Sequence, residues 1–186
     1  ISDAGKTLIQ VIDNGKGMSE TDARMAFERH ATSKINTAND LFRIKTKGFR
    51  GEALASIAAV STVELKTKSE NDKIGTKLRI SASETQLQEA DACPQGSNFA
   101  VKNLFFNIPA RRKFLKSDQT EIKHIITEVQ RVALTHPDII FTLSHNNKEI
   151  FNLGKGNVKQ RIVSIFGRSM ENNLIDINVN TDLVRI

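Results

Sequence analysis

The stretch Asp13-Asn14-Gly15-Lys16-Gly17-Met18 decides how the rest of this sequence is interpreted. It follows an apolar run at residues 8–12, which is typical of a β-strand. Such a strand carries the Asp13 carboxylate to the end of a sheet, where its acceptor oxygens need a hydrogen-bond donor. Gly15 and Gly17 permit a sharp turn and let a flat ligand approach the backbone. The amino group of a purine would satisfy Asp13, although Asp-Asn-Gly is also common turn chemistry.

A second pair of glycines lies in the stretch Gly48-Phe49-Arg50-Gly51-Glu52-Ala53-Leu54, which leads into a small-residue segment at 55–59. This pattern predicts a loop that feeds a helix, and glycines at a helix start let phosphate oxygens approach the unpaired N–H groups there. Neither glycine motif is a Walker loop or the Gly-x-Gly-x-x-Gly of a dinucleotide fold. A carboxylate for a base and a glycine-led helix start for phosphates together predict a nucleotide pocket.

The composition sets limits on size, partners and compartment. The chain has 186 residues, 39% of them hydrophobic, and its net charge of +6 favours a polyanionic partner. Cys93 is the only cysteine, which excludes an intrachain disulfide and favours a reducing compartment. No apolar run is long enough to predict a membrane span. The sequence begins without methionine and close to a strand, so we expect an internal fragment.

The spacing of apolar residues predicts the remaining elements. Residues 30–47 are expected to form a long polar loop that acts as a lid, and residues 83–95 are expected to be irregular. Helices are expected at 19–27, 51–59, 122–135 and 158–166, and strands at 7–13, 62–68, 75–81, 98–104, 139–146, 148–153 and 174–179.

Four stretches resemble the motifs of the MutL family of DNA mismatch repair proteins, and they follow one another through most of the chain. They are residues 13–18, residues 48–57, Arg29-His30-Ala31-Thr32-Ser33-Lys34-Ile35 and Leu104-Phe105-Phe106-Asn107-Ile108-Pro109-Ala110-Arg111-Arg112-Lys113-Phe114-Leu115. MutL belongs to the GHKL ATPase superfamily, with gyrase B subunits, a heat-shock chaperone and histidine kinases. The resemblance implies an α/β fold, a two-layer α/β sandwich of the GHKL (Bergerat) ATPase type with a mixed sheet.

The resemblance also implies a domain organisation. Residues 1–153 would form the GHKL-type ATPase domain without its N-terminal helix. Residues 154–157, with the sequence Gly-Lys-Gly-Asn, would be a linker. Residues 158–186 would be the beginning of a second, transducer α/β domain that resembles a ribosomal-protein fold.

The family motifs imply how a nucleotide is bound. Asp13 would bind the adenine amino group directly, and Gly15, Gly17 and Met18 would surround the base. A further adenine contact is assigned to Ser97 rather than to Thr76. Ser97 stands directly before a predicted strand that leads to the last motif, although the family usually has threonine there.

The phosphates would be bound by main-chain donors of the Gly48 to Leu54 loop. Hydroxyl and ammonium groups of the expected lid would close over them, although a solvated loop has the same composition. The implied nucleotide-binding residues are Asp13, Gly15, Gly17, Met18, Thr32, Ser33, Lys34, Gly48, Phe49, Arg50, Gly51, Glu52, Ala53, Leu54 and Ser97.

The densest basic cluster consists of Arg111, Arg112, Lys113 and Lys116, which are candidates for contacts to DNA phosphates. A basic helix start is also a routine surface feature. The neighbouring Phe105-Phe106 pair could stack on bases, but its position at a strand end favours core packing. The histidines show no metal-ligand spacing.

ATP hydrolysis needs a general base for the attacking water and usually a Mg²⁺ ion on the phosphates. The resemblance implies that a helix upstream of residue 1 supplies both, with a glutamate as base and an asparagine as metal ligand. We therefore assign no catalytic residue and no metal ligand in this sequence.

The resemblance implies that the parent protein is an ATPase, the ATP-binding and ATP-hydrolysing component of DNA mismatch repair. It would use ATP and Mg²⁺, form a homodimer through its N-terminal regions when ATP binds, and act as a switched clamp that couples a mismatch-recognition protein of the MutS type to DNA. No membrane is involved, and its location would be cytoplasmic and nucleoid-associated in a bacterium or nuclear in a eukaryote.

Two alternatives remain open. One is the ATPase domain of a gyrase-type topoisomerase, against which the Gly48 to Leu54 loop and the Arg111-Arg112-Lys113 stretch both count. The other is a non-catalytic DNA-binding or dimerisation module that keeps the nucleotide loops as scaffold.

Overall fold

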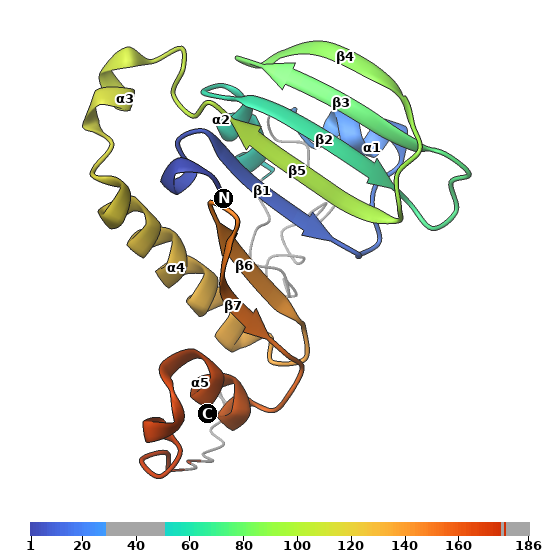
Figure 1. The fold of residues 1–186 in the computed structure, drawn as a ribbon. Coiled ribbons are helices and arrows are strands. Elements are labelled where there is room, and N and C mark those ends of the chain that lie inside the picture. Colours follow the sequence, from blue (N-terminus) through green and yellow to red (C-terminus); the bar gives the residue numbers. More distant parts are fainter. Residues whose placement is uncertain (29–50, 176, 178–186) are drawn as a thin grey trace, which may run out of the picture. The chain divides into compact units, whose positions relative to one another are not determined.

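A computed structural model describes residues 1–28, 51–175 and 177. The chain forms two compact units, Ile1–Asp118 and Gln119–Ile186 (Figure 1). The elements of the first unit are η1 (Asp3–Gly5), β1 (Leu8–Asp13), α1 (Glu20–Met25), α2 (Ala53–Ala58), β2 (Thr62–Lys68), β3 (Gly75–Ser81), β4 (Glu84–Asp91), β5 (Gly96–Lys102) and α3 (Pro109–Phe114). Those that follow are α4 (Asp118–Thr135), β6 (Phe141–His145), β7 (Lys148–Leu153), α5 (Val158–Phe166) and η3 (Arg168–Met170).

The strands of the first unit form one five-stranded sheet in the order β1-β5-β2-β3-β4. The helices α1 and α2 lie on one face of this sheet (Figure 1), which confirms the predicted two-layer α/β fold. The expected mixed sheet differs in one respect, because every pairing among the described strands of this sheet is antiparallel. Short connections join β2 to β3 and β3 to β4, and strands joined by tight turns pair antiparallel.

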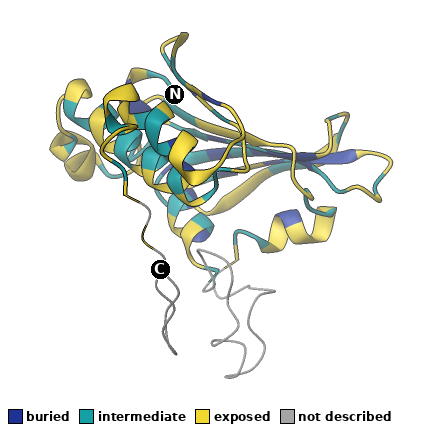
Figure 2. Ribbon diagram, turned by 90° about the horizontal axis from the view of Figure 1, so that it is seen from below, coloured by how far each residue is buried: buried dark blue, intermediate teal, exposed yellow. Residues whose placement is uncertain are grey.

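The core of the first unit lies between the sheet and these two helices. Buried residues follow the central strands (Figure 2), where Leu65 on β2 and Leu78 on β3 are at most 1% exposed. Ala23 of α1 and Ala58 of α2 belong to the same cluster, because small side chains let the helices approach the sheet. The alternation of apolar residues in β2 and β3 is the pattern that predicted both strands.

The strand β4 is a feature that the sequence prediction missed. Residues 83–95 were expected to be irregular, but β4 lies within them and pairs with β3 from Gly75↔Asp91 to Ser81↔Glu84. β4 is an edge strand, and most of its side chains are exposed, so it shows no apolar alternation. Backbone hydrogen bonds to β3 hold it in place. The expectation of irregular structure is therefore wrong for this segment.

Local capping explains where α1 begins. The Ser19 hydroxyl accepts the Asp22 N–H at 3.2 Å and donates to the Asp22 carboxylate at 2.8 Å. Glu20 and Asp22 place negative charge in the first turn, where the helix dipole favours it. The predicted start of this helix at Ser19 is confirmed.

The second unit combines the long helix α4 with the β6-β7 hairpin and α5. The predicted hairpin turn at Asn146-Asn147 is confirmed, with φ of 48° and 65°. The predicted strand at 174–179 lies partly outside the described residues. None of the described helices is long and apolar enough to cross a membrane.

Arg161 anchors α5 within this unit. Its guanidinium is buried, 5.4 Å from the ring centroid of Phe141, and its Nη2 donates to the carbonyl oxygens of Pro137, Ile139 and Gly154. These bonds tie α5 to the segment before β6 and to Gly154 after β7. The domain ranges 1–153, 154–157 and 158–186 stay a prediction.

Candidate functional site

A row of polar residues crosses the helix-covered face at one end of the sheet. Asp13 lies opposite Ser97 in the β1-β5 pairing, and Ser97 lies opposite Thr67 in the β5-β2 pairing. Thr67 in turn lies opposite Thr76 on β3. Paired residues of an antiparallel sheet project to the same face, so these four side chains form one line, here called the polar row. Three of them are buried, whereas Asp13 at the end of the row is exposed.

The Thr67 hydroxyl holds the row together. It accepts the Met18 N–H at 3.0 Å and donates to the Gly96 carbonyl at 2.8 Å. It also lies 3.2 Å from the Ser97 hydroxyl. The single hydroxyl hydrogen of Thr67 is directed at Gly96, so we assign Ser97 as the donor in this contact. The Ser97 oxygen then keeps acceptor capacity for a ligand.

The turn that follows β1 holds the Asp13 carboxylate. Its Oδ1 accepts the Gly15 N–H at 2.9 Å, and the lack of a Cβ at residue 15 leaves room for this contact. Among the residues that the structure describes, this is the only hydrogen bond to the Asp13 side chain. Its second carboxylate oxygen is therefore available to an external donor, such as an amino group.

Two glycines let three chain segments meet beside the polar row. Gly17 has a φ of +66°, and a Cβ there would lie 1.9 Å from the Lys68 carbonyl oxygen. Gly96 has a φ of +111°, and a Cβ there would lie 2.1 Å from the Asp13 carbonyl oxygen. Both positions therefore exclude a larger residue. The sequence prediction gave Gly17 a role toward the ligand and missed Gly96, whose only signal is its place before a strand.

The other described residues predicted to bind the nucleotide are Met18 and the residues at the start of α2. Met18 is half-buried and packs against the core cluster. Gly51 has a φ of +68° and precedes α2, Glu52 is the N-cap residue, and Ala53 and Leu54 begin the helix. The predicted residues that lie outside the described part of the chain are Thr32, Ser33, Lys34, Gly48, Phe49 and Arg50.

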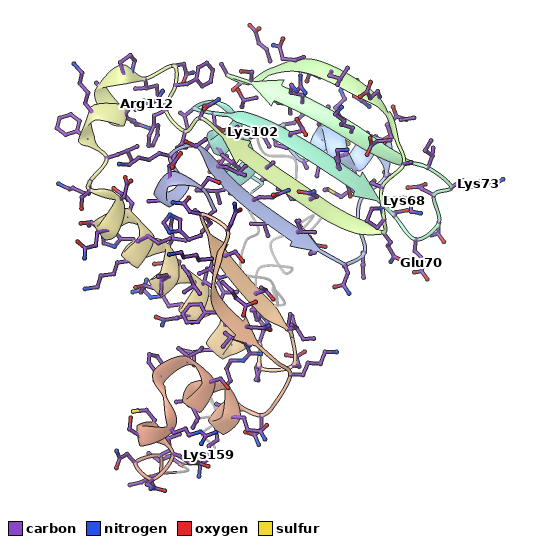
Figure 3. All side chains as sticks on the ribbon, in the orientation of Figure 1. Lys68, Glu70, Lys73, Lys102, Arg112 and Lys159 are labelled. Carbon is purple, nitrogen blue, oxygen red and sulfur yellow. The ribbon has the colours of Figure 1, made fainter. Side chains whose placement is uncertain are left out.

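The basic cluster predicted to contact DNA lies beyond the other end of β5. The strand begins beside the polar row and ends at Lys102, and a strand of 7 residues is roughly 20 Å long. Figure 3 shows Lys68 and Lys102 at opposite ends of the sheet, with Arg112 on α3 beyond Lys102. Arg111 and Lys113 are also exposed on α3, and Lys116 follows it. The structure therefore separates this cluster from the polar row.

The phenylalanines before α3 differ from their prediction. Phe105 is half-buried beneath the guanidinium of Arg111, whose Cζ lies 5.9 Å from the ring centroid. Phe106 is 39% exposed, so the expectation of core packing is wrong for this residue.

The outer face of the sheet, opposite the helices, carries charges that pair with one another. Glu64 lies 3.3 Å from Arg79 and 3.2 Å from Lys102. Burial raises the pKa of Glu64, but the hydrogen bonds and charges of both cations outweigh it, so this pKa lies below its ordinary value of 4.5. The other cross-strand pairs are Lys66–Asp91 at 3.2 Å and Lys77–Glu89 at 2.9 Å.

A small pocket of about 180 Å³ lies at the same end of the sheet as the polar row, and Asp13 and Ser97 are among the residues that line it. Burial and the nearby Asp91 charge raise the pKa of Cys93, which lines this pocket, so its thiol stays protonated at neutral pH. Asp13 and Ser97 were predicted from the sequence, but the other lining residues were not, because they come from strands far apart in the chain. The residues that line it are Ile12, Asp13, Lys66, Asp91, Ala92, Cys93, Pro94, Gln95, Gly96, Ser97 and Asn98.

Comparisons with known proteins give the chain its family. The sequence model described as "Histidine kinase-, DNA gyrase B-, and HSP90-like ATPase" matches residues 2–103. DNA mismatch repair protein MutL of Bacteroides fragilis is 59% identical over all 186 residues, which cover 30% of that protein. The MutL protein of Phocaeicola vulgatus is also 59% identical over the same residues and the same share.

A solved structure supports the same assignment. It is the Aquifex aeolicus MutL ATPase domain complexed with ADP, which is 30% identical, with a TM-score of 0.69 over 89% of this chain and 58% of that one. The chain spans about 30% of the length of its curated relatives. It belongs to the histidine kinase-, DNA gyrase B- and HSP90-like ATPase family, and its whole length is similar to MutL proteins.

Proposed function

We propose that the polar row binds the adenine of ATP, and that the chain is the ATP-binding part of an ATPase in DNA mismatch repair. The observation that carries this proposal is the Asp13 carboxylate, whose second oxygen is available beside Ser97 in a member of an ATPase family. The activity of the whole protein belongs to the proposal, because the chain spans only about 30% of its relatives' length.

The geometry of the row favours adenine over guanine. An ionised aspartate offers only acceptor oxygens, so it suits the 6-amino group of adenine. Guanine has a carbonyl oxygen at this position. This oxygen and the Asp13 carboxylate are both hydrogen-bond acceptors, so they could not bond to each other. The Ser97 oxygen adds an acceptor beside Asp13, held in place by Thr67. A site with fixed polar groups rejects a ligand that leaves them unpaired.

The phosphate contacts of the proposal rest on the family resemblance. The Gly48 to Leu54 loop would donate main-chain N–H groups, and Thr32, Ser33 and Lys34 would close over the phosphates. The positive φ of Gly51 supports a sharp turn there. Glycine adopts this backbone conformation more readily than residues with a side chain.

Mg²⁺ is part of this proposal as the ion that accompanies ATP. Within residues 1–28, 51–175 and 177, no group of three or more His, Cys, Asp or Glu side chains could hold a metal ion. Mg²⁺ usually binds through substrate phosphates, waters and only one or two carboxylates. The described residues therefore give it no assigned ligand, and no residue here is assigned as the catalytic base.

The finer role that we propose follows from the MutL relatives. ATP binding would join two copies through their N-terminal regions into a clamp, and hydrolysis would reset it. The partners would be DNA and a mismatch-recognition protein of the MutS type. The relatives reported above are bacterial, which favours a cytoplasmic, nucleoid-associated location over a nuclear one.

Calorimetric titration tests the proposal. A non-hydrolysable ATP analogue with Mg²⁺ is titrated into this chain and into one extended upstream, each with and without Asp13→Ala. A hydrogen bond to a charged group contributes about 1.5–3 kcal/mol, so we expect the substitution to weaken binding by tenfold or more. Binding that does not depend on Asp13 in a folded, extended chain would favour the non-catalytic DNA or dimerisation module instead.

A further inference from the structure

The helix α3 presents an aromatic ring to solvent among cations. Phe114, its last residue, is 80% exposed, which is unusual for a large apolar side chain. Arg111, Arg112 and Lys113 precede it directly and are also exposed. We call these four residues the α3 surface. No acidic residue lies between Pro109 and Phe114.

The cations of the α3 surface form no ion pairs with other described residues. Among the described residues, neither Arg112 nor Lys113 lies within salt-bridge distance of a carboxylate, and Arg111 rests on the ring of Phe105. The nearest acid in the sequence, Asp118, pairs with Lys6 at 2.6 Å. The α3 surface therefore carries a net positive charge that suits a polyanion.

Helix stability alone accounts for only part of this arrangement. The three cations lie in the last turn of α3, where the helix dipole favours positive charge. That effect gives no reason for Phe114 to stay in water. An exposed aromatic ring beside arginines is instead the combination that stacks on unpaired bases while the cations contact phosphates.

We propose that the α3 surface binds single-stranded DNA, with Phe114 stacking on a base and Arg112 and Lys113 contacting the backbone. Unpaired bases are required, because the bases of a duplex are stacked inside it and present no face to a ring on a helix surface. The proposal sharpens the DNA role within the proposed function. It is independent of ATP binding, because α3 and the polar row lie at opposite ends of β5.

Fluorescence anisotropy with this chain and a labelled oligodeoxythymidine tests the stacking role. Phe114→Leu keeps an apolar side chain but removes the aromatic face, and Phe114→Trp restores one. Base stacking contributes about 1–3 kcal/mol, so we expect Phe114→Leu to weaken binding by about tenfold and Phe114→Trp to bind like the wild type. The matched control is Phe166→Leu, at an exposed phenylalanine at the end of α5, which should change nothing.

Charge and strand type supply the remaining arms of the test. Arg112→Gln with Lys113→Gln should weaken binding and lower the slope of log affinity against log salt by about 1–2, whereas Lys159→Gln on α5 should not. Phe114→Leu should leave binding to a duplex and to an ATP analogue unchanged. Equal losses for single strand and duplex, no loss with Phe114→Leu, or no binding by the wild type at low salt would each overturn the proposal. If the wild type binds the oligonucleotide but does not bind the ATP analogue, that result counts against the nucleotide site and not against the α3 surface.

Discussion

The helix-covered face of the five-stranded sheet ends in three buried hydroxyls and one exposed carboxylate, whereas the outer face is crossed by ion pairs between neighbouring strands. On the outer face each carboxylate of these pairs has a cation beside it, as Glu64 has Arg79 and Lys102. On the helix-covered face Asp13 has no cation within salt-bridge distance among the described residues, and one of its oxygens accepts only from the turn.

The difference separates residues that serve the fold from Asp13, which we propose binds a ligand. The groups of these partly exposed ion pairs satisfy one another, and such pairs near the surface contribute little stability. The Thr67 and Ser97 hydroxyls contact each other, and Thr67 also bonds the backbone of Met18 and Gly96. Their bonds fix the position of the end of β1 without using the Asp13 carboxylate. The comparison therefore supports our proposal that the ligand site lies on the helix-covered face.

The largest expected effect concerns the glycine that joins β5 to β1. Gly96→Ala should destabilise the first unit by about 3 kcal/mol or more, because a Cβ there would lie 2.1 Å from the Asp13 carbonyl oxygen at a positive φ. Urea denaturation measures the loss. Gly154→Ala is the matched control, because nothing lies within 4 Å of a Cβ at that position. Equal stability of the two variants would mean that the end of β1 is not held as described.

A smaller loss is expected at the centre of the polar row. Thr67→Val keeps the shape of the side chain but leaves the Met18 N–H and the Gly96 carbonyl without this partner, which should cost about 1–3 kcal/mol. Thr62→Val, on the outer face of the same strand, removes a single hydroxyl contact to Ser81 and should cost less. Thermal unfolding of both variants gives the comparison. A larger loss for Thr62→Val would contradict the organising role of Thr67.

The smallest effect is expected on the outer face. Glu64→Gln should destabilise the protein by only about 0.5–1 kcal/mol at pH 7, because its partners are partly exposed. The pKa of Glu64 is lowered on folding, so its contribution is present above the ordinary value of 4.5 and is lost as the pH falls through the folded pKa. Stability curves of the two proteins should therefore converge as the pH falls below the folded pKa of Glu64. A stability difference between the wild type and Glu64→Gln that grows as the pH falls would show that the cations do not favour the ionised form of Glu64.

Sequence patterns predicted the fold where side chains alternate and failed where they do not. The bounds expected for β2 and β3 match the structure, because each of these strands buries one face. The bounds expected for β7 also match, although its burial does not alternate. β4 escaped prediction because an edge strand is held by its backbone, which carries no compositional signal. The mixed sheet came from the family resemblance, whereas the short connections between consecutive described strands give antiparallel pairs.

The sequence predicted those residues of the candidate site that are marked by their neighbours in the chain. Asp13 stands out because it follows a strand and precedes glycines, and Ser97 stands out because it directly precedes the predicted strand that leads to the last family motif. The register places these two residues opposite each other. Thr67 could not be predicted, because a threonine in a strand is ordinary and only the pairing of β2 with β5 brings it to Ser97. Gly96 likewise owes its role to contacts with the distant end of β1.

The central claim is that the Asp13 carboxylate accepts the 6-amino group of adenine. The direct measurement is a double cycle in which calorimetry compares an ATP analogue with the same compound lacking the 6-amino group, each with the wild type and with Asp13→Ala. Asp91→Asn, on the outer face at the same end of the sheet, serves as the control variant. We predict that loss of the amino group weakens binding at least tenfold in the wild type and in Asp91→Asn, but less than about twofold in Asp13→Ala. Equal losses in the wild type and in Asp13→Ala would contradict the claim.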